Sequence, residues 1–351
     1  MGKKHVTSKR RPSVTAVAGK SDPKTTRPES PSRREEVDER SVGEKIGKTL
    51  DAFPDKIDLR DWAYHPTLQI LPDEVVNCPL VPEILDQGNE GACTGFALAA
   101  VINYLLHQRR SMRRVSSRML YELARRYDEW PGEKYEGSSA RGAMKGWERH
   151  GVCKRELWPD GLHGPEHFNQ AIADQAVFTP GGTYYRVNFR QVRDIHAAIH
   201  EVGIVYATLM VHAGWGEPGP KTVTVKRGGR SKSSMTLPVI ARKGKADGGH
   251  AIAMVGYTSQ GFVVQNSWGT KWGKKGFALL PYEDFMLHAT DVWVAQLGVP
   301  VMADLWAGGA ADVTSGTFRA GQVIPLNEIR PYVIDVGNNG ALSDRGDYWT
   351  T

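Results

Sequence analysis

Hydrophobic side chains repeat at helical spacing in the first part of the chain. In the segment 92–108 (ACTGFALAAVINYLLHQ) the apolar residues fall on one broad face, which predicts a buried helix. The same reasoning predicts further helices over 117–127, 139–150 and 191–202, the last of them ended by Gly203. The first half of the chain is therefore predicted to be mainly helical.

After Gly203 the pattern changes to short runs of small, apolar and β-branched residues between glycines. These runs predict strands at 204–211 (IVYATLMV), 250–257 (HAIAMVGY) and 262–268 (FVVQNSW), with a turn at 258–261 (TSQG). The segment 217–249 is rich in Gly, Pro, Lys and Arg, and it predicts a long basic loop or a flexible hairpin. The second half is thus predicted to be mainly sheet.

Both ends of the chain differ from this globular part. Residues 1–48 are polar and basic with few large apolar side chains, so we predict a disordered basic tail. The first 50 residues carry 13 Lys and Arg against 7 Asp and Glu, which accounts for the whole net charge of +6. The tail is interpreted as a solubilising linker, or as a weak electrostatic tether to nucleic acid or another acidic surface. Residues 49–300 would form the main domain, and 301–351 a C-terminal extension, interpreted as truncated or processed, with a strand at 331–336 (PYVIDV).

Composition points to a protein of the cytoplasm. No apolar run reaches the roughly 18 residues that a membrane span needs, and the N-terminus has no apolar signal-peptide core. We therefore expect a cytoplasmic protein without membrane contact. The three cysteines, Cys78, Cys93 and Cys153, are too sparse for a disulfide framework and are expected to be reduced.

Metal and cofactor sites have little support in the sequence. His196 and His200 have a spacing that could bind zinc, and four residues further upstream imitate the order of ligands in a zinc finger: His150, Cys153, His163 and His167. Neither group has the surrounding motif that a zinc site would need. No phosphate-binding glycine loop or calcium loop is present either, so no metal and no cofactor are predicted.

Cys93 and His250 are the best candidates for nucleophilic chemistry. Cys93 lies at the start of a predicted helix, where unpaired backbone N–H groups favour a thiolate. His250 opens an apolar strand after two glycines, and the predicted hairpin brings Asn266 near it. The Asn266 amide oxygen can fix the imidazole tautomer, and the Trp268 indole can shield that bond from water. The four residues together therefore predict a general base with its orienting group.

Gln87 is the candidate for stabilising an oxyanion. It lies six residues before Cys93, and Gly88 and Gly91 allow a tight turn between them. Its side-chain amide could then donate beside the backbone N–H of Cys93. A lone cysteine or histidine is more often structural, but the ordered set favours a catalytic site.

Three blocks in this order resemble the signatures of papain-like cysteine peptidases: QGNEGACTGFA (87–97), GGHAIAMVGY (248–257) and VVQNSWGTKWGKKGFA (263–278). The resemblance implies an α+β, two-lobed fold with a helical left lobe, a β-barrel-like right lobe and a cleft between them. It also implies a cysteine endopeptidase that hydrolyses peptide bonds through a Cys93 acyl-enzyme, with His250 as base and acid. The implied partner is a protein or peptide substrate.

By the same resemblance, substrate would bind along Gly137, Ser138 and Ser139 on one side, and near Gly249, Ala251 and Trp268 on the other. Two positions depart from the family pattern. Glu90 stands where secreted members have a disulfide-forming cysteine. Thr94 stands where an aromatic residue normally follows the nucleophile, which predicts space beneath Cys93.

Two other functions stay open at this stage. The same site could serve an acyl transferase or a deamidase, or the chain could be a catalytically inert papain-like binding scaffold, as Thr94 and the basic loop suggest. The polar tail contains no recognisable helical inhibitory propeptide, so we do not expect a conventional zymogen. Control by a regulatory protein partner, by a missing domain or by cleavage of the chain is a hypothesis.

Overall fold

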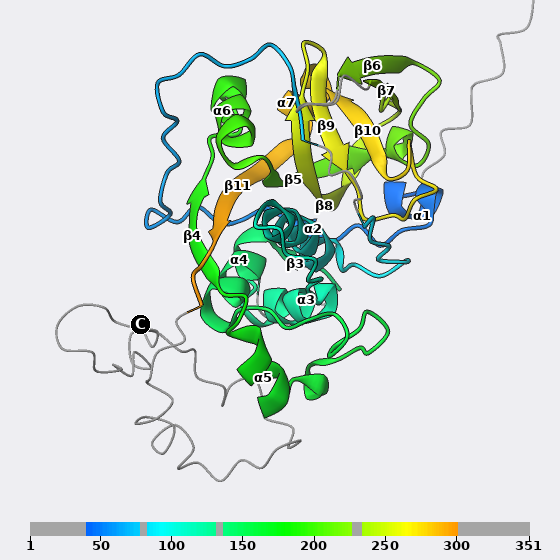
Figure 1. The fold of residues 1–351 in the computed structure, drawn as a ribbon. Helices are drawn as coiled ribbons and strands as arrows, with labels where there is room; N and C mark the ends of the chain where they lie inside the picture. The colour runs from blue at the N-terminus through cyan, green and yellow to red at the C-terminus, as the bar shows by residue number, and fades with distance from the viewer. Residues whose placement is uncertain (1–39, 78–82, 131–135, 227–233, 301–351) are drawn as a thin grey trace, which may run out of the picture. The chain divides into compact units, whose positions relative to one another are not determined.

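Three helices form the helical part of the fold: α2 (Cys93–Gln108), α3 (Ser117–Arg126) and α4 (Ala140–His150). In this computed structural model, the described residues are 40–77, 83–130, 136–226 and 234–300 (Figure 1). Every residue of α2 from Cys93 to Leu106 is buried, because α3 contacts one side of this helix and the sheet contacts another. Gly95 permits the close approach to α3, since a Cβ there would lie 2.5 Å from the Tyr121 nitrogen. The predicted central helix is confirmed.

One antiparallel sheet forms the second part, and its strands do not follow chain order. Their order across the sheet is β10 (Phe277–Pro281), β9 (Gly261–Gln265), β8 (Ala246–Tyr257), β5 (Val205–His212), β11 (Ala289–Leu297) and β4 (Gly181–Arg186). The short strand β2 (Val75–Val76) also pairs with β8. Within the described residues β10 and β4 are the edges, so the predicted barrel-like lobe is an open sheet. The predicted α+β fold is confirmed.

Two helices, α6 (Val192–Val202) and α7 (Tyr282–His288), and a hairpin pack against the sheet. Helix α5 (Gln170–Ala176) lies on the far side of the helical part (Figure 1), and the single turns η1 (Pro165–His167) and η2 (Ala213–Trp215) complete the fold. The predicted basic loop contains the hairpin β6 (Thr222–Lys226) and β7 (Ser234–Pro238), while its last four residues, 246–249, belong to β8. No helix in the described ranges has the length and apolar character needed to cross a membrane.

The N-terminal residues of the described chain pack on both parts of the fold. Helix α1 (Val42–Ile46) is capped by Ser41 and Glu44 and buries Val42 against the sheet. Strand β1 (Ala52–Phe53) follows and pairs in parallel with β3 (Ser138–Ser139). Residues 40–48 are therefore folded, and the predicted disordered tail ends too late in the chain. Residues 1–39, the predicted extension 301–351 and its strand at 331–336 lie outside the described residues.

Candidate active site

Cys93 is the first residue of α2 and is completely buried. The backbone N–H groups of Ala251, Thr94 and Cys93 itself face its sulfur. Burial is the largest influence and raises the pKa of the Cys93 thiol to about 12, although these N–H groups lower it. Cys153 is the other free cysteine of the described residues and is also buried, whereas Cys78 lies outside them. In the described conformation Cys93 is a neutral thiol.

The side chains of His250 and Asn266 meet beside two neighbouring strands. His250 lies in β8 and Asn266 directly follows β9, and Nε2 of the imidazole lies 2.8 Å from Oδ1 of the amide. An amide oxygen can only accept, so Nε2 carries the hydrogen and Nδ1 of the neutral ring is an acceptor. Nδ1 is buried and has no hydrogen-bond partner among the described residues. Ala251, whose N–H faces the Cys93 sulfur, directly follows His250 in β8, so this unpaired acceptor belongs to the residue next to the one that contacts the thiol.

Aromatic rings shield this pair from water. The Trp268 ring centroid lies 4.7 Å from that of His250, and Trp215 meets the imidazole edge-on at 6.2 Å. Lys48 places its ammonium over Trp268. Burial, and then the Lys48 charge, lower the pKa of His250 to about 4, against the hydrogen bond to Asn266. Trp215 was not among the predicted site residues. The available sequence signal was its position as an aromatic residue shortly after a buried strand.

Gln87 is held beside the same region by Ser267. Its backbone nitrogen donates to the Ser267 carbonyl at 2.9 Å, and its Oε1 accepts from the Ser267 hydroxyl at 2.6 Å. Nε2 donates to the carbonyl of Glu90 at 2.8 Å. An amide nitrogen carries two hydrogens, so one of them remains for a further acceptor. Sequence reasoning identified Gln87 but missed Ser267, whose role follows only from the three-dimensional pairing.

Thr94 does not leave the predicted space beneath the nucleophile. It is fully buried, its hydroxyl lies 2.5 Å from that of Ser138, and its carbonyl accepts from the Tyr206 hydroxyl at 3.0 Å. The expectation of a gap there is therefore wrong, because Ser138 and Tyr206 pack against the smaller residue.

Glu90, the second departure, forms an ion pair. Its two carboxylate oxygens accept from the two terminal nitrogens of Arg118 at 2.7 and 2.5 Å. Arg118 belongs to α3 and is almost completely buried. This bidentate pair ties the loop that carries Gln87 to the helical part of the fold.

Residues 49–55 form a segment that we call the strap, and it crosses the predicted substrate-binding residues. The Gly249 nitrogen donates to the Leu50 carbonyl at 2.9 Å, and Asp51 forms a bridge with Gly249. On the other side, Ala52 pairs with Ser138. A Cβ added at Gly137 would lie 1.6 Å from the Asp51 oxygen, so this position requires glycine. The strap thus lies between the two predicted binding edges, and sequence reasoning did not find it.

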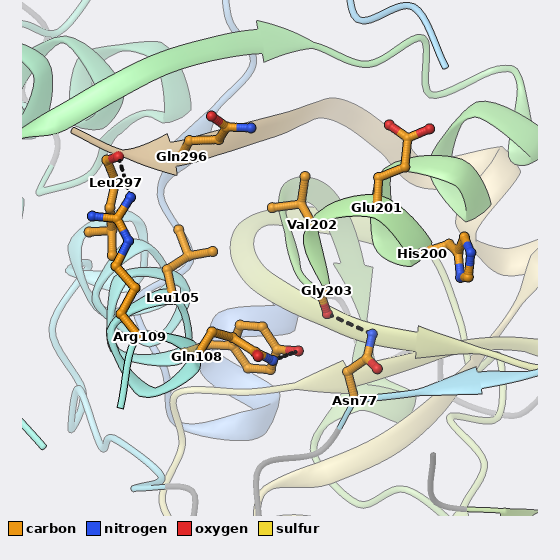
Figure 2. Close-up of a pocket in the computed structure, with 11 residues that line it drawn as sticks. Asn77, Leu105, Gln108, Arg109, His200, Glu201, Val202, Gly203, Gln296 and Leu297 are labelled. Atoms are coloured by element: carbon orange, nitrogen blue, oxygen red, sulfur yellow. Dashed lines mark hydrogen bonds between the residues drawn. The ribbon is translucent and has the colours of Figure 1, made fainter. Parts of the chain in front are cut away.

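A separate hollow of about 390 Å³ lies at the opposite end of α2 (Figure 2). The helix has 16 residues, so this end is about 24 Å from Cys93. Two of its polar side chains are paired with the protein: Arg109 donates to the Leu297 carbonyl at 2.9 Å, and Asn77 donates to that of Gly203 at 3.1 Å. The hollow contains none of the candidate catalytic residues.

The histidines with metal-like spacing have other contacts. His196 hydrogen-bonds the Tyr282 hydroxyl at 2.8 Å and stacks on Tyr257, while His150 hydrogen-bonds the Tyr127 hydroxyl at 2.7 Å. In the part of the chain that the structure describes, no three His, Cys, Asp or Glu side chains gather closely enough to hold a metal ion.

The fold, with a cysteine at the start of a buried helix and a histidine bonded to an asparagine, defines the class of papain-like proteins. Residues 73–286, more than half of the chain, match the papain family cysteine proteases. The chain belongs to this family.

Its relatives and structural neighbours agree with this assignment. An uncharacterized peptidase C1-like protein of Acanthamoeba polyphaga mimivirus is 25% identical over 64% of this chain and 72% of its own length. A cathepsin L-like proteinase of Fasciola hepatica is 24% identical over 64% of this chain, which spans only 60% of that relative. Among solved structures, xylellain, a cysteine protease from Xylella fastidiosa, is 25% identical, with a TM-score of 0.57 over 71% of this chain and 96% of its own. Procathepsin B from Trypanosoma congolense shares the fold at 17% identity, with a TM-score of 0.54 over 74% of this chain and 89% of its own.

Proposed function

We propose that this chain is a cysteine endopeptidase that hydrolyses peptide bonds through an acyl-enzyme on Cys93. The observation that carries the proposal is the state of His250. Its Nε2 is fixed by Asn266 at 2.8 Å, and its Nδ1 is buried without a partner among the described residues. A buried, unpaired acceptor is costly, and proton transfer from a neighbouring thiol gives it a function.

These positions support the following reaction. His250 Nδ1 accepts the proton of Cys93, and the thiolate attacks the carbonyl carbon of the substrate. The oxyanion accepts hydrogen bonds from the Cys93 backbone N–H and from the remaining N–H of Gln87. The imidazolium then gives its proton to the leaving amine, which leaves a thioester. His250 next deprotonates water, hydrolysis releases the acid, and the thiol is restored.

The described conformation is a closed form of this enzyme. Cys93 is fully buried and the strap lies along the edges where substrate would bind. Burial is the main cause of both the raised thiol pKa and the lowered imidazole pKa, so the two groups are neutral here. Movement of the strap would admit substrate and water together, and renewed solvation would favour the thiolate–imidazolium pair.

Val42→Asp provides a way to open the enzyme without altering the proposed catalytic residues. Val42 is buried, and its nitrogen donates to the Asp247 carboxylate at 3.0 Å, so a second carboxylate there should expel α1. Lys45→Asp is the control, because Lys45 is exposed on the same helix. The wild type, both variants and Val42→Asp/Cys93→Ala would be incubated with a diverse peptide pool and an active-site epoxide. Mass spectrometry would then identify cleaved peptides and the labelled residue.

We expect cleavage and Cys93 labelling to be strongest in Val42→Asp and absent when Cys93 is alanine. Full burial of Cys93 would equally suit an inert papain-like scaffold, the second candidate. A folded Val42→Asp protein whose Cys93 reacts but which cleaves no peptide would support that scaffold and overturn the peptidase. An amine acceptor added to the same reaction would reveal an acyl transferase, because the acyl group would then appear on the amine.

A further inference from the structure

The strap ends in a carboxylate that the rest of the protein holds with several donors. Oδ1 of Asp55 accepts from the Arg141 backbone nitrogen at 2.8 Å, and Oδ2 accepts from Trp293 Nε1 at 2.8 Å. The Arg186 guanidinium lies 3.6 Å from Oδ2. The Asp55 backbone nitrogen in turn donates to the Asp291 carboxylate at 3.0 Å. The Asp55 side chain is completely buried, so these groups form a pocket around it, which we call the carboxylate pocket.

The carboxylate pocket lies close to the nucleophile. Trp293 in β11 is the register partner of Tyr206 in β5, and the Tyr206 hydroxyl donates to the carbonyl of Thr94, next to Cys93. Burial first, and then negative charge at Cys93, Asp55 and Asp291, raise the pKa of Tyr206, so these groups all lie near its phenol. Arg141 is the second residue of α4, which directly follows the binding edge β3. The pocket therefore lies near both Cys93 and the predicted binding edge β3.

The donors of the carboxylate pocket are fixed independently of Asp55. The Arg186 guanidinium also contacts the carboxylates of Asp291 and Asp61, and the Arg141 guanidinium contacts those of Asp61 and Glu129. The Arg141 N–H and the Trp293 indole N–H stay in place with their own elements. When the strap leaves, these two N–H groups lose their acceptors in a buried site, and an unpaired buried donor is costly. The vacated pocket thus favours a new acceptor of the same kind.

We propose that the carboxylate pocket recognises an acidic side chain of a bound peptide, and that Asp55 occupies it in the closed form. The substrate meaning of this inference rests on the proposed peptidase function. A carboxyl group satisfies both N–H donors and faces the Arg186 charge, although the neighbouring Asp291 carboxylate opposes a further negative charge. An apolar side chain leaves the donors unpaired, and a basic one meets Arg186. Because the recognition is by side-chain and fixed backbone donors, it does not depend on the direction in which the peptide runs.

The test uses the full chain with Asp55→Ala, which vacates the pocket and loosens the strap. Alkylation of Cys93 by iodoacetamide would be followed by mass spectrometry, with buried Cys153 as the internal reference. We expect Cys93 to react about tenfold faster than in the wild type, because the two hydrogen bonds that hold the Asp55 side chain are lost. Acetylated peptides of one sequence, with Asp, Asn, Ala or Lys moved through its central positions, would then be added as protectants. The Asp peptides should protect Cys93 at about tenfold lower concentration than the Asn peptides.

Two further variants on the Asp55→Ala background identify the pocket. Arg186→Met removes the charge and should abolish the Asp-over-Asn preference, while Arg193→Met, an exposed arginine of α6, should retain it. Trp293→Phe removes a single N–H from the pocket and should weaken the same preference if Arg186→Met does not fold. Unchanged Cys93 labelling in Asp55→Ala, or equal protection by Asp and Asn peptides, would overturn the proposal.

Protection does not require hydrolysis, so this test is separable from that of the peptidase. Asp-selective protection without any cleaved peptide would support the carboxylate pocket and refute the peptidase. Cleavage with no preference for Asp peptides would support the peptidase and refute the carboxylate pocket.

Discussion

Nε2 of His250 lies 2.8 Å from Oδ1 of Asn266, and both side chains are buried beneath Trp268. The amide holds the imidazole in the tautomer whose Nδ1 can accept a proton. We predict that Asn266→Ala, in the open Val42→Asp background, lowers kcat by about 10²-fold, because the tautomer and orientation of the ring are lost. Steady-state peptide hydrolysis measures this effect.

Asn266→Asp is the matched comparison. Nδ2 of Asn266 has no partner among the described residues, so an aspartate loses no hydrogen bond seen there. It keeps the acceptor and adds a charge that favours the imidazolium. We expect it to retain more activity than the alanine variant and to shift the pH profile upward. Equal activity of both variants would argue against an orienting role for Asn266.

Gln87→Ala should lower kcat with little change in KM. The amide is positioned by Ser267 and keeps one N–H available, and loss of one oxyanion donor costs about 10²-fold in kcat. Gln87→Glu should be equally impaired, since it keeps the shape but has no N–H to donate. Urea unfolding of both variants controls for lost stability, and a rise in KM alone would contradict the prediction.

Cys93 should react slowly in the closed form and quickly in the open one. With the thiol pKa raised to about 12 by burial, only about one thiol in ten thousand is ionised at pH 8. We therefore expect alkylation of the wild type to accelerate steadily between pH 6 and 9, whereas Val42→Asp should already react rapidly near pH 7. Iodoacetamide labelling at fixed times across this range, with Lys45→Asp as control, measures both rates. Equal alkylation rates of Cys93 in Val42→Asp and in the wild type near pH 7 would contradict the prediction.

Docking of the strap should weaken as the pH rises towards neutrality. Burial, and then the neighbouring Asp291, raise the pKa of Asp55 from 3.8 to about 7, although Arg141 lowers it. Between these two pKa values the docked strap binds more protons than the released strap. Docking therefore becomes less favourable as the pH increases from about 4 to about 7, and it changes no further above pH 7. The facing groups are the carboxylates of Asp61 and Asp291 and the guanidinium groups of Arg141 and Arg186.

Asp55→Asn isolates this effect, because it removes the titrating group but keeps the shape. Cys93 alkylation in wild type, corrected for the intrinsic pH dependence of the thiol with Asp55→Asn, should show additional opening between pH 5 and 7. Total stability is a poorer measure, since burial lowers the pKa of His250, His150 and His196 and makes their contribution increase with pH over part of this range. Parallel curves for the two proteins would contradict the prediction.

Local patterns predicted the elements that bury a continuous apolar face. The helix at 92–108 and the strand that contains His250 were predicted because their apolar side chains repeat at the spacing of a buried element. The motif around Gln87 and Cys93 indicated where the candidate site lies. Helix α1 was missed because Val42 and Ile46 are its only large apolar residues; the Ser41–Glu44 capping box was the available signal. The α+β class was implied by the family resemblance and agreed with the predicted helices and strands, whereas the open order of the sheet was not predicted.

The strap and the carboxylate pocket have no local signal at all. Ala52 pairs with Ser138, and Asp55 meets Arg141, Arg186 and Trp293, which are distant in the chain. A short extended segment with an isolated aspartate carries no periodicity, so only the tertiary structure brings these contacts together.

The Glu90–Arg118 pair gives the loop before the nucleophile a cross-link that no reductant can cut. Burial raises the pKa of Glu90, but the hydrogen bonds and charge of Arg118 outweigh it, so the carboxylate stays ionised below the usual glutamate range. A thiol enzyme must keep its nucleophile reduced, and a disulfide beside that nucleophile would be exposed to the same electron donors and to exchange with the catalytic sulfur. Here the two demands are chemically independent: glutathione-like conditions that preserve Cys93 leave the loop intact.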